Sequence, residues 1–178
     1  IFSTTHNHAI RIACSNVVLD GRGKTITGAG SPASPSETGP DVYGVRVNAG
    51  GPSSDVTVKN LIVEKKFYGV IFEAVANGVI DAVNTGDNNF GIYLWDTDNN
   101  TVSNNTSNSN LSSGIVLDGD NCVNTGNTFS NNTTSSNAQF GILLWLVCPS
   151  STLTGNTANY NGNSAIALSP GCDGSTLT

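Results

Sequence analysis

A short phrase of alternating apolar and polar positions recurs through the chain at nearly constant spacing. In each copy a small residue is followed by an apolar residue, any residue and a second apolar residue, and the copies begin at Gly44, Gly69, Gly91, Gly114, Gly141 and Ala165. Successive copies begin 25, 22, 23, 27 and 24 residues apart. Alternation of this kind predicts short, half-buried β-strands, and a period of this size predicts a solenoid of stacked β-coils.

Two segments depart from the regular spacing. The phrase first occurs at Ala9, but Gly44 follows only 35 residues later. Residues 29–41 explain this gap as a loop excursion, because three of the six prolines gather there among Gly and Ser. The long coil before Gly141 predicts a second excursion at 130–139. Residues 1–178 then form a single domain. Because neither end resembles a polar cap and the chain begins at Ile1, we expect a segment of a longer protein.

A column of asparagines supports this register. One asparagine per coil precedes the next copy of the phrase, at Asn60, Asn84, Asn105, Asn127 and Asn156. At a bend, an asparagine side chain satisfies backbone groups and tolerates left-handed geometry. Stacked copies can also hydrogen-bond from coil to coil. We therefore expect these asparagines to be structural.

These motifs resemble a known family. The runs Ser15 to Gly28 and Val56 to Val63, with the repeated Gly-Ile-x-Leu and Asn-Asn-Thr, resemble NosD-like proteins within the broader pectate-lyase-like β-helix superfamily. The resemblance and the usual crossover between parallel strands imply an all-β, right-handed parallel β-helix solenoid of six to seven coils. Proteins of this type include sugar hydrolases, lyases, epimerases, surface proteins and a periplasmic accessory to copper enzyme maturation. The fold therefore does not select an activity.

Charge and hydropathy exclude some partners. The net charge is −6, and all seven Lys and Arg residues lie at or before Lys66. Binding to nucleic acid or to an anionic membrane surface needs cations, so neither is expected. No stretch approaches the roughly 20 apolar residues of a membrane span, so no membrane span is expected either.

The repeat gathers candidate binding residues on one face. Side chains of equal phase lie on adjacent coils about 4.8 Å apart. Two and four residues after the anchors, the outward face collects Tyr93, Trp95 and Trp145 beside Glu73 and Asp118. Aromatic rings stack on the apolar faces of sugars, and carboxylates bind hydroxyl groups, so this face predicts glycan binding. The alternative is an apolar stripe that is covered by another protein subunit.

A glycoside hydrolase is the enzymatic alternative. It needs two carboxylates, roughly 5 Å apart for retention or 6.5 to 9.5 Å apart for inversion, and Asp118 with Glu73 or Asp96 could supply them. A lyase is disfavoured, because no Lys, Arg or His follows Lys66 to stabilise a carbanion. The Asp-Pro-His-Asp motif of alginate epimerases and the motif series of polygalacturonases are also absent.

The acidic residues suggest one metal site. A candidate calcium site consists of Asp96, Asp98, Asp118 and Asp120, because calcium takes six to eight oxygen ligands. The Gly and Glu that complete a calcium loop are missing, so a hydrogen-bonded turn is the alternative. No other cofactor is expected. The pair His6 and His8, in a chain without Met, does not predict a copper or zinc site.

Cysteines and glycosylation sequons bear on the compartment. Cys148 and Cys172 each lie seven residues after an anchor on adjacent coils, which predicts a disulfide. A bridge between Cys122 and Cys148 is the competitor, and buried free thiols are the alternative. Asn-x-Ser/Thr sequons begin at Asn99, Asn104, Asn105, Asn110, Asn131 and Asn132, which makes these asparagines candidates for glycosylation.

Together these observations predict an extracellular, cell-surface or periplasmic module with a structural, assembly or glycan-binding role. Its expected partners are a polysaccharide, or other protein subunits bound through the outward face or the open coil ends. The alternative function is a glycoside hydrolase that acts on polysaccharides.

Overall fold

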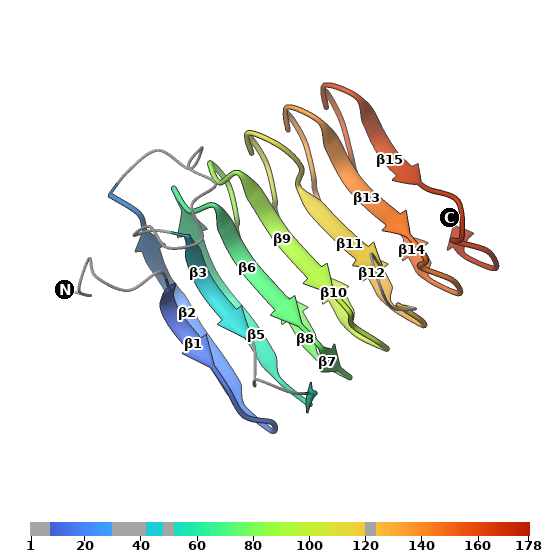
Figure 1. Cartoon of the computed structure of the whole chain (residues 1–178). Coiled ribbons are helices and arrows are strands. Elements are labelled where there is room, and N and C mark those ends of the chain that lie inside the picture. Colours follow the sequence, from blue (N-terminus) through green and yellow to red (C-terminus); the bar gives the residue numbers. More distant parts are fainter. Residues whose placement is uncertain (1–7, 30–41, 48–51, 120–123) are drawn as a thin grey trace.

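The chain folds into a parallel β-helix whose coils follow one another along a single axis (Figure 1). The computed structural model describes residues 8–29, 42–47, 52–119 and 124–178. These residues form strands and bends without a helix, and each of the two main sheets contains seven parallel strands. The predicted all-β solenoid is confirmed. The described residues include no helix long and apolar enough to cross a membrane.

The repeated phrase forms the first sheet, called sheet A. Its strands, in spatial order, are β1 (His8–Ile12), β3 (Tyr43–Val47), β6 (Tyr68–Glu73), β9 (Phe90–Trp95), β11 (Ile115–Gly119), β13 (Phe140–Leu146) and β15 (Ser164–Leu168). Equivalent apolar residues are Cα partners, as in Ile92, Ile115 and Ile142. The predicted spacing is therefore the actual coil length.

The second sheet, called sheet B, faces sheet A across the core. It contains β2 (Val18–Thr27), β5 (Thr57–Glu64), β8 (Val79–Asp81), β10 (Thr101–Ser103), β12 (Thr128–Ser130), β14 (Thr152–Thr154) and β16 (Thr176–Leu177). Its three-residue strands each bury only the middle side chain, such as Ile80 or Phe129. A small third sheet pairs β4 (Ser53–Ser54) with β7 (Val75–Ala76).

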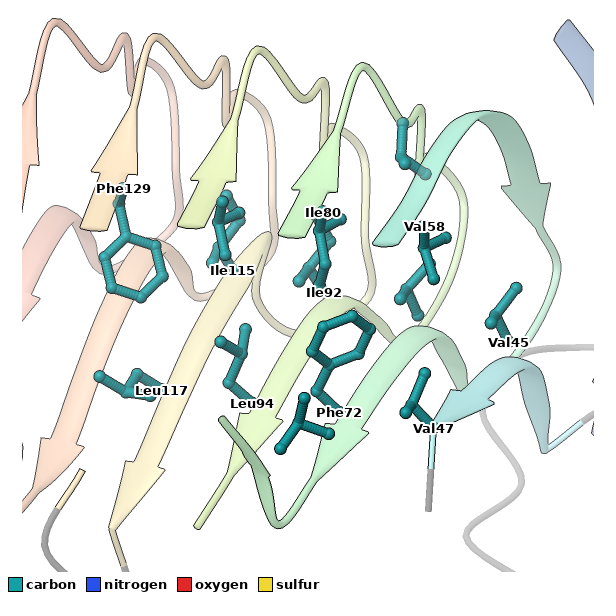
Figure 2. Close-up of a cluster of buried hydrophobic side chains, with 14 of the residues drawn as sticks. Val45, Val47, Val58, Phe72, Ile80, Ile92, Leu94, Ile115, Leu117 and Phe129 are labelled. Carbon is teal, nitrogen blue, oxygen red and sulfur yellow. The ribbon is translucent and has the colours of Figure 1, made fainter. Parts of the chain in front are cut away.

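The core is a continuous apolar column between the two sheets. Phe72, Ile92 and Leu94 of sheet A face residues such as Ile80 and Phe129 of sheet B, and all five are fully buried (Figure 2). Burial of each such side chain stabilises the fold by about 1.5–3 kcal/mol. The pleat turns the intervening residues of sheet A away from this core, and among them Tyr93 and Leu143 are partly exposed.

Glycine begins most copies of the phrase because adjacent coils approach closely there. A Cβ atom added at Gly69 would lie 2.5 Å from the carbonyl oxygen of Gly91, and one added at Gly91 would lie 2.6 Å from that of Gly114. Neither glycine has a positive φ. Lack of space, and not backbone conformation, therefore selects glycine in this column.

Three ladders of asparagines, all buried except the last residues Asn156 and Asn161, join the coils on either side of sheet B. Beyond the first asparagine of a ladder, each side-chain oxygen accepts a hydrogen bond from the backbone N–H of the ladder residue one coil earlier. The ladders are Asn100–Asn127, Asn105–Asn132–Asn156 and Asn88–Asn110–Asn137–Asn161. The prediction of coil-to-coil hydrogen bonding is confirmed, but the predicted column combined asparagines from different positions of the coil. Asn60 and Asn84 are exposed, and Asn127 belongs to a different ladder from Asn105.

The second predicted excursion is wrong. Residues 130–139 stack in register on the previous coil, as the bridge between Thr106 and Thr133 and the bond from Asn110 to Asn137 demonstrate. Asp118 pairs with Trp95, 23 residues earlier, whereas Thr128 pairs with Thr101, 27 residues earlier. The additional residues of this coil therefore lie between Gly119 and Asn124. The first predicted excursion, 29–41, lies outside the described residues except for Ala29.

Candidate functional site

The outward face of sheet A carries two adjoining cavities. One, of about 210 Å³, is lined by Tyr43, Tyr68, Ile71, Glu73, Tyr93, Trp95 and Asp118. The other, of about 270 Å³, is lined by Phe90, Tyr93, Ser112, Ser113, Val116, Asp118, Gln139, Phe140, Leu143 and Trp145. Because Tyr93 and Asp118 line both cavities, we treat the two as one feature, called the sheet A groove.

Acidic and aromatic residues alternate along one row of this groove. Glu73 is the Cα partner of Trp95, Trp95 of Asp118, and Asp118 of Trp145. Neighbouring members of the row are one strand spacing apart, about 4.8 Å. Trp95 is 40% exposed and Trp145 is 45% exposed, so both indole rings are accessible from solvent. The structure thus brings together the five residues that the repeat placed on this face.

A stack of aromatic rings forms the end of the groove near β3. The rings of Tyr43 and Tyr68 lie 5.5 Å apart and nearly parallel, and Phe90 continues the stack at 5.5 Å from Tyr68. Tyr93 meets Tyr68 and Phe90 edge-on at 5.2 Å. Sequence reasoning missed this stack, although its signal was present as an aromatic residue directly before the anchors Gly44, Gly69 and Gly91.

Glu73 is held by an ion pair beside this stack. The Nε atom of Arg46 donates to Glu73 Oε2 at 2.9 Å, and the guanidinium of Arg46 lies 4.6 Å from the centre of the Tyr43 ring. Glu73 is only 7% exposed. A buried carboxylate is stable when it is paired and hydrogen-bonded, so Arg46 compensates the charge of Glu73.

Asp118 is oriented at the point that the two cavities share. The Tyr93 hydroxyl donates a hydrogen bond to Asp118 Oδ2, and Asn124 Nδ2 donates to the Asp118 backbone oxygen at 2.6 Å. The residue is partly exposed. Its carboxylate therefore lies in a fixed position between the two tryptophans of the row.

Asp96, the third predicted catalytic carboxylate, does not join the groove. It lies at the bend after β9 with a φ of 54° and lines neither cavity. Its Oδ1 atom is buried and makes no hydrogen bond. Asp96 therefore does not form a catalytic pair with Asp118 within the groove.

The described residues do not form the predicted calcium site. Asp98 Oδ1 accepts a hydrogen bond from the backbone N–H of Thr125 at 2.8 Å, whereas Asp118 accepts one from Tyr93. Asp120 lies outside the described residues. Within the described ranges, no three His, Cys, Asp or Glu side chains gather closely enough to hold a metal.

The predicted disulfide is also absent. Cys148 and Cys172 are buried free thiols, and their sulfurs donate to the backbone oxygens of Trp145 at 3.2 Å and of Leu146 at 3.4 Å. Because Cys148 is a free thiol, the competing bridge to Cys122 is wrong as well; Cys122 itself lies outside the described residues. Burial, and secondly the neighbouring Cys172, raise the pKa of Cys148 to about 12. The repeat spacing correctly placed the two cysteines at equivalent positions of adjacent coils, but each thiol hydrogen-bonds to a backbone oxygen.

Burial removes half of the glycosylation candidates. Asn105, Asn110 and Asn132 are at most 2% exposed, and their side chains belong to the asparagine ladders. No sugar can be attached to these amides without breaking the coil. The other three candidates, Asn99, Asn104 and Asn131, are exposed at bends.

Comparison with known proteins adds a family and a fold. The model of the family described as "Periplasmic copper-binding protein (NosD)" matches residues 16–178. The crystal structure of the periplasmic alginate epimerase AlgG matches at a TM-score of 0.56 and 13% identity, over 76% of this chain and 41% of the epimerase. A mutant of that enzyme matches at a TM-score of 0.58 and 12% identity, over 96% of this chain and 45% of the epimerase.

The likeness to the epimerase concerns the fold alone, because the identity is so low. This chain also spans less than half of the length of the epimerase chains that it matches. No match was found among curated protein sequences.

Proposed function

We propose, from the premise that this chain belongs to the NosD family of β-helix proteins, that it is a module acting outside the cytoplasm whose sheet A groove binds a glycan. The observation that carries this proposal is the row in which Trp95 and Trp145 alternate with Glu73 and Asp118. The family is one of periplasmic proteins, in agreement with the location that the sequence predicts.

The form of the groove supports an extended ligand. Each cavity is smaller than the roughly 300–1,000 Å³ of a typical small-molecule pocket, but the two adjoin through Tyr93 and Asp118. An exposed apolar patch rimmed by polar groups marks an interaction site. Flat indole rings contact the apolar faces of sugars, and the Asp118 carboxylate accepts hydrogen bonds from sugar hydroxyls. A polymer lying across the strands would meet all of these groups.

Hydrolysis of the bound glycan is a second candidate function. Glu73 and Asp118 line the same cavity and are two strands apart in one row, so two carboxylates of the kind that glycoside hydrolysis uses share this part of the groove. The environment of Glu73 argues against hydrolysis, because this side chain is only 7% exposed and its Oε2 atom is already bonded to Arg46 at 2.9 Å. Binding without turnover is therefore the better-supported function.

Copper, which the family description names, does not fit the described residues. Copper(I) prefers thiolate and thioether ligands, yet the sequence contains no Met. The raised pKa of Cys148 keeps that thiol protonated at neutral pH. Within the described residues no cluster of three metal-binding side chains exists. We therefore infer the fold and the compartment from the family and propose no role for copper in the groove.

Truncation of the two tryptophans tests glycan binding. We expect Trp95→Ala and Trp145→Ala each to weaken retention on immobilised polysaccharide by roughly five- to thirty-fold, because an aromatic contact contributes about 1–2 kcal/mol. Affinity electrophoresis against a polysaccharide panel measures the effect. Tyr160→Ala is the matched control, because this aromatic residue is 92% exposed and lines neither cavity. Unchanged retention in both tryptophan variants would contradict the proposal.

A further inference from the structure

The residues that line the sheet A groove include two carboxylates and no cation, and one of these carboxylates, Glu73, is paired with Arg46 at the border of the groove. The residues that line its two cavities include the carboxylates of Glu73 and Asp118, and no Lys, Arg or His is among them. The sequence explains this asymmetry, because no Lys, Arg or His follows Lys66. The strands β9, β11, β13 and β15 therefore cannot present a cation to a ligand.

The nearest cation is already engaged. Arg46 donates to Glu73 at 2.9 Å and stacks on Tyr43, so its charge is already balanced by Glu73. The next cation on this sheet, Arg11, is the Cα partner of Arg46 on β1. Arg11 is four strand spacings, about 19 Å, from Asp118. That distance exceeds the Debye length of about 8 Å at physiological ionic strength.

From these charges we propose that the groove selects an extended neutral polysaccharide and rejects polyuronates; this inference rests on the proposed glycan-binding function. A uronate at the Asp118 position would place two carboxylates together without a compensating cation, and like charges repel strongly in a partly desolvated site. A neutral sugar instead offers hydroxyl donors to Asp118. Its binding requires no cation.

The spacing of the row fits a chain of sugars lying across the strands. Trp95 and Trp145 are two strand spacings apart, about 9.6 Å, which is close to the length of two pyranose units in an extended polymer. Asp118 lies between them in the same row. The ligand therefore stacks a ring on each indole and directs hydroxyl groups toward Asp118.

The name of the structural neighbour suggests a uronate polymer for comparison. The matched epimerase is named for alginate, which is a polyuronate, whereas the charges in this groove oppose such a ligand. A direct comparison of neutral and uronate polymers on the same protein therefore tests the inference.

The experiment measures affinity for glucomannan, xylan and mixed-linkage glucan against alginate and polygalacturonate, each at 20 and 300 mM NaCl. We expect at least one neutral polymer to bind at least tenfold more tightly than either uronate. The affinity for this neutral polymer should change less than twofold between the two salt concentrations, and Trp95→Ala should weaken binding of the same polymer. Asp118→Asn should reduce the difference in affinity between neutral and uronate polymers, because it should improve uronate binding. Tyr160→Ala serves as the control variant.

Two outcomes would overturn the inference, and they are distinguishable. Tryptophan-dependent binding of a uronate as tight as that of every neutral polymer would overturn the neutral selectivity while leaving the glycan-binding function in place. Binding of neither class, by protein that retains its β-sheet circular dichroism, would overturn both.

Discussion

Glycine occupies the first position of five successive copies of the repeat, where it lets adjacent coils pass close together. At Gly91 an added methyl group would overlap the Ser107 hydroxyl and crowd the backbone oxygen of Gly114. We expect Gly91→Ala to destabilise the fold by about 1–3 kcal/mol, the usual cost of overpacking. Urea unfolding followed by circular dichroism measures the change.

The control for this substitution is Gly86→Ala. Gly86 also has no positive φ, but the nearest atom to its added Cβ would be 3.2 Å away. The control should therefore alter the free energy of unfolding by much less than Gly91→Ala. Equal effects of the two substitutions would mean that close approach is not what selects glycine.

The buried thiol of Cys148 gives the stability a dependence on alkaline pH. Below its ordinary pKa of 9.0, the thiol is protonated in both the folded and the unfolded chain. Between 9.0 and about 12, the unfolded chain ionises while the folded chain does not. Stability attributable to this group is therefore full below pH 9 and is lost as the pH rises toward 12, at no more than about 1.4 kcal/mol per pH unit.

Urea unfolding between pH 8 and pH 11 measures this loss, and Cys148→Ala is the comparison because it removes the titrating group. The difference in unfolding free energy between the wild type and this variant should shrink as the pH rises. A difference that stays constant across this range would contradict the assignment.

At the scale of the element, the asparagine ladders support the coils where the β-strands are only three residues long. Asn132 is fully buried, and its side chain accepts from Asn105 and donates to the backbone oxygen of Val102. Asn132→Ala leaves buried groups without partners, at about 1–3 kcal/mol each. We therefore expect a loss of about 2–4 kcal/mol in the free energy of unfolding.

The matched control is Asn163→Ala, because Asn163 is exposed and belongs to none of the three ladders. Its effect on the urea midpoint should be within about 0.5 kcal/mol of zero. A similarly small effect of Asn132→Ala would show that the ladders contribute little to stability.

The ladders also explain why the second excursion was misplaced. Residues 130–139 are rich in Ser, Asn and Thr, a composition that usually marks a loop. In this fold the same residue types are buried at the coil bends, where Asn132, Thr134 and Asn137 are at most 1% exposed. Composition alone does not distinguish a solvated loop from a stacked polar bend. Strand pairing does, because the match of Thr128 with Thr101 places the additional residues before β12.

At the scale of the whole molecule, the period of the repeat predicted the fold, the register of sheet A and the row from Glu73 to Trp145. Those features depend only on which residues occupy the same position in successive coils. The pairing of Arg46 with Glu73 and the orientation of the thiol of Cys148 depend instead on side-chain conformation. Position within the coil cannot supply that information, so the pairing of Glu73 with Arg46 emerged only from the structure.

The charge distribution acts along the whole solenoid. Basic residues are confined to the first coils, whereas the chain beyond Lys66 contains eight acidic residues and no basic one. The molecule therefore has a mixed-charge end and an acidic end, and the groove extends toward the acidic one. Anionic polymers and surfaces are repelled most from that part of the molecule.

The variable length of the coils also has an evolutionary consequence. Asp118 in β11 pairs with a residue 23 positions earlier, whereas Thr128 in β12 pairs with a residue 27 positions earlier, so four residues are added between these two strands. Both strands nevertheless pair in register with the preceding coil. The change in coil length falls between Gly119 and Asn124, after the strand that carries Asp118. A lineage can therefore lengthen or shorten the chain at this point while the strands on both sides keep their register and the apolar column stays continuous.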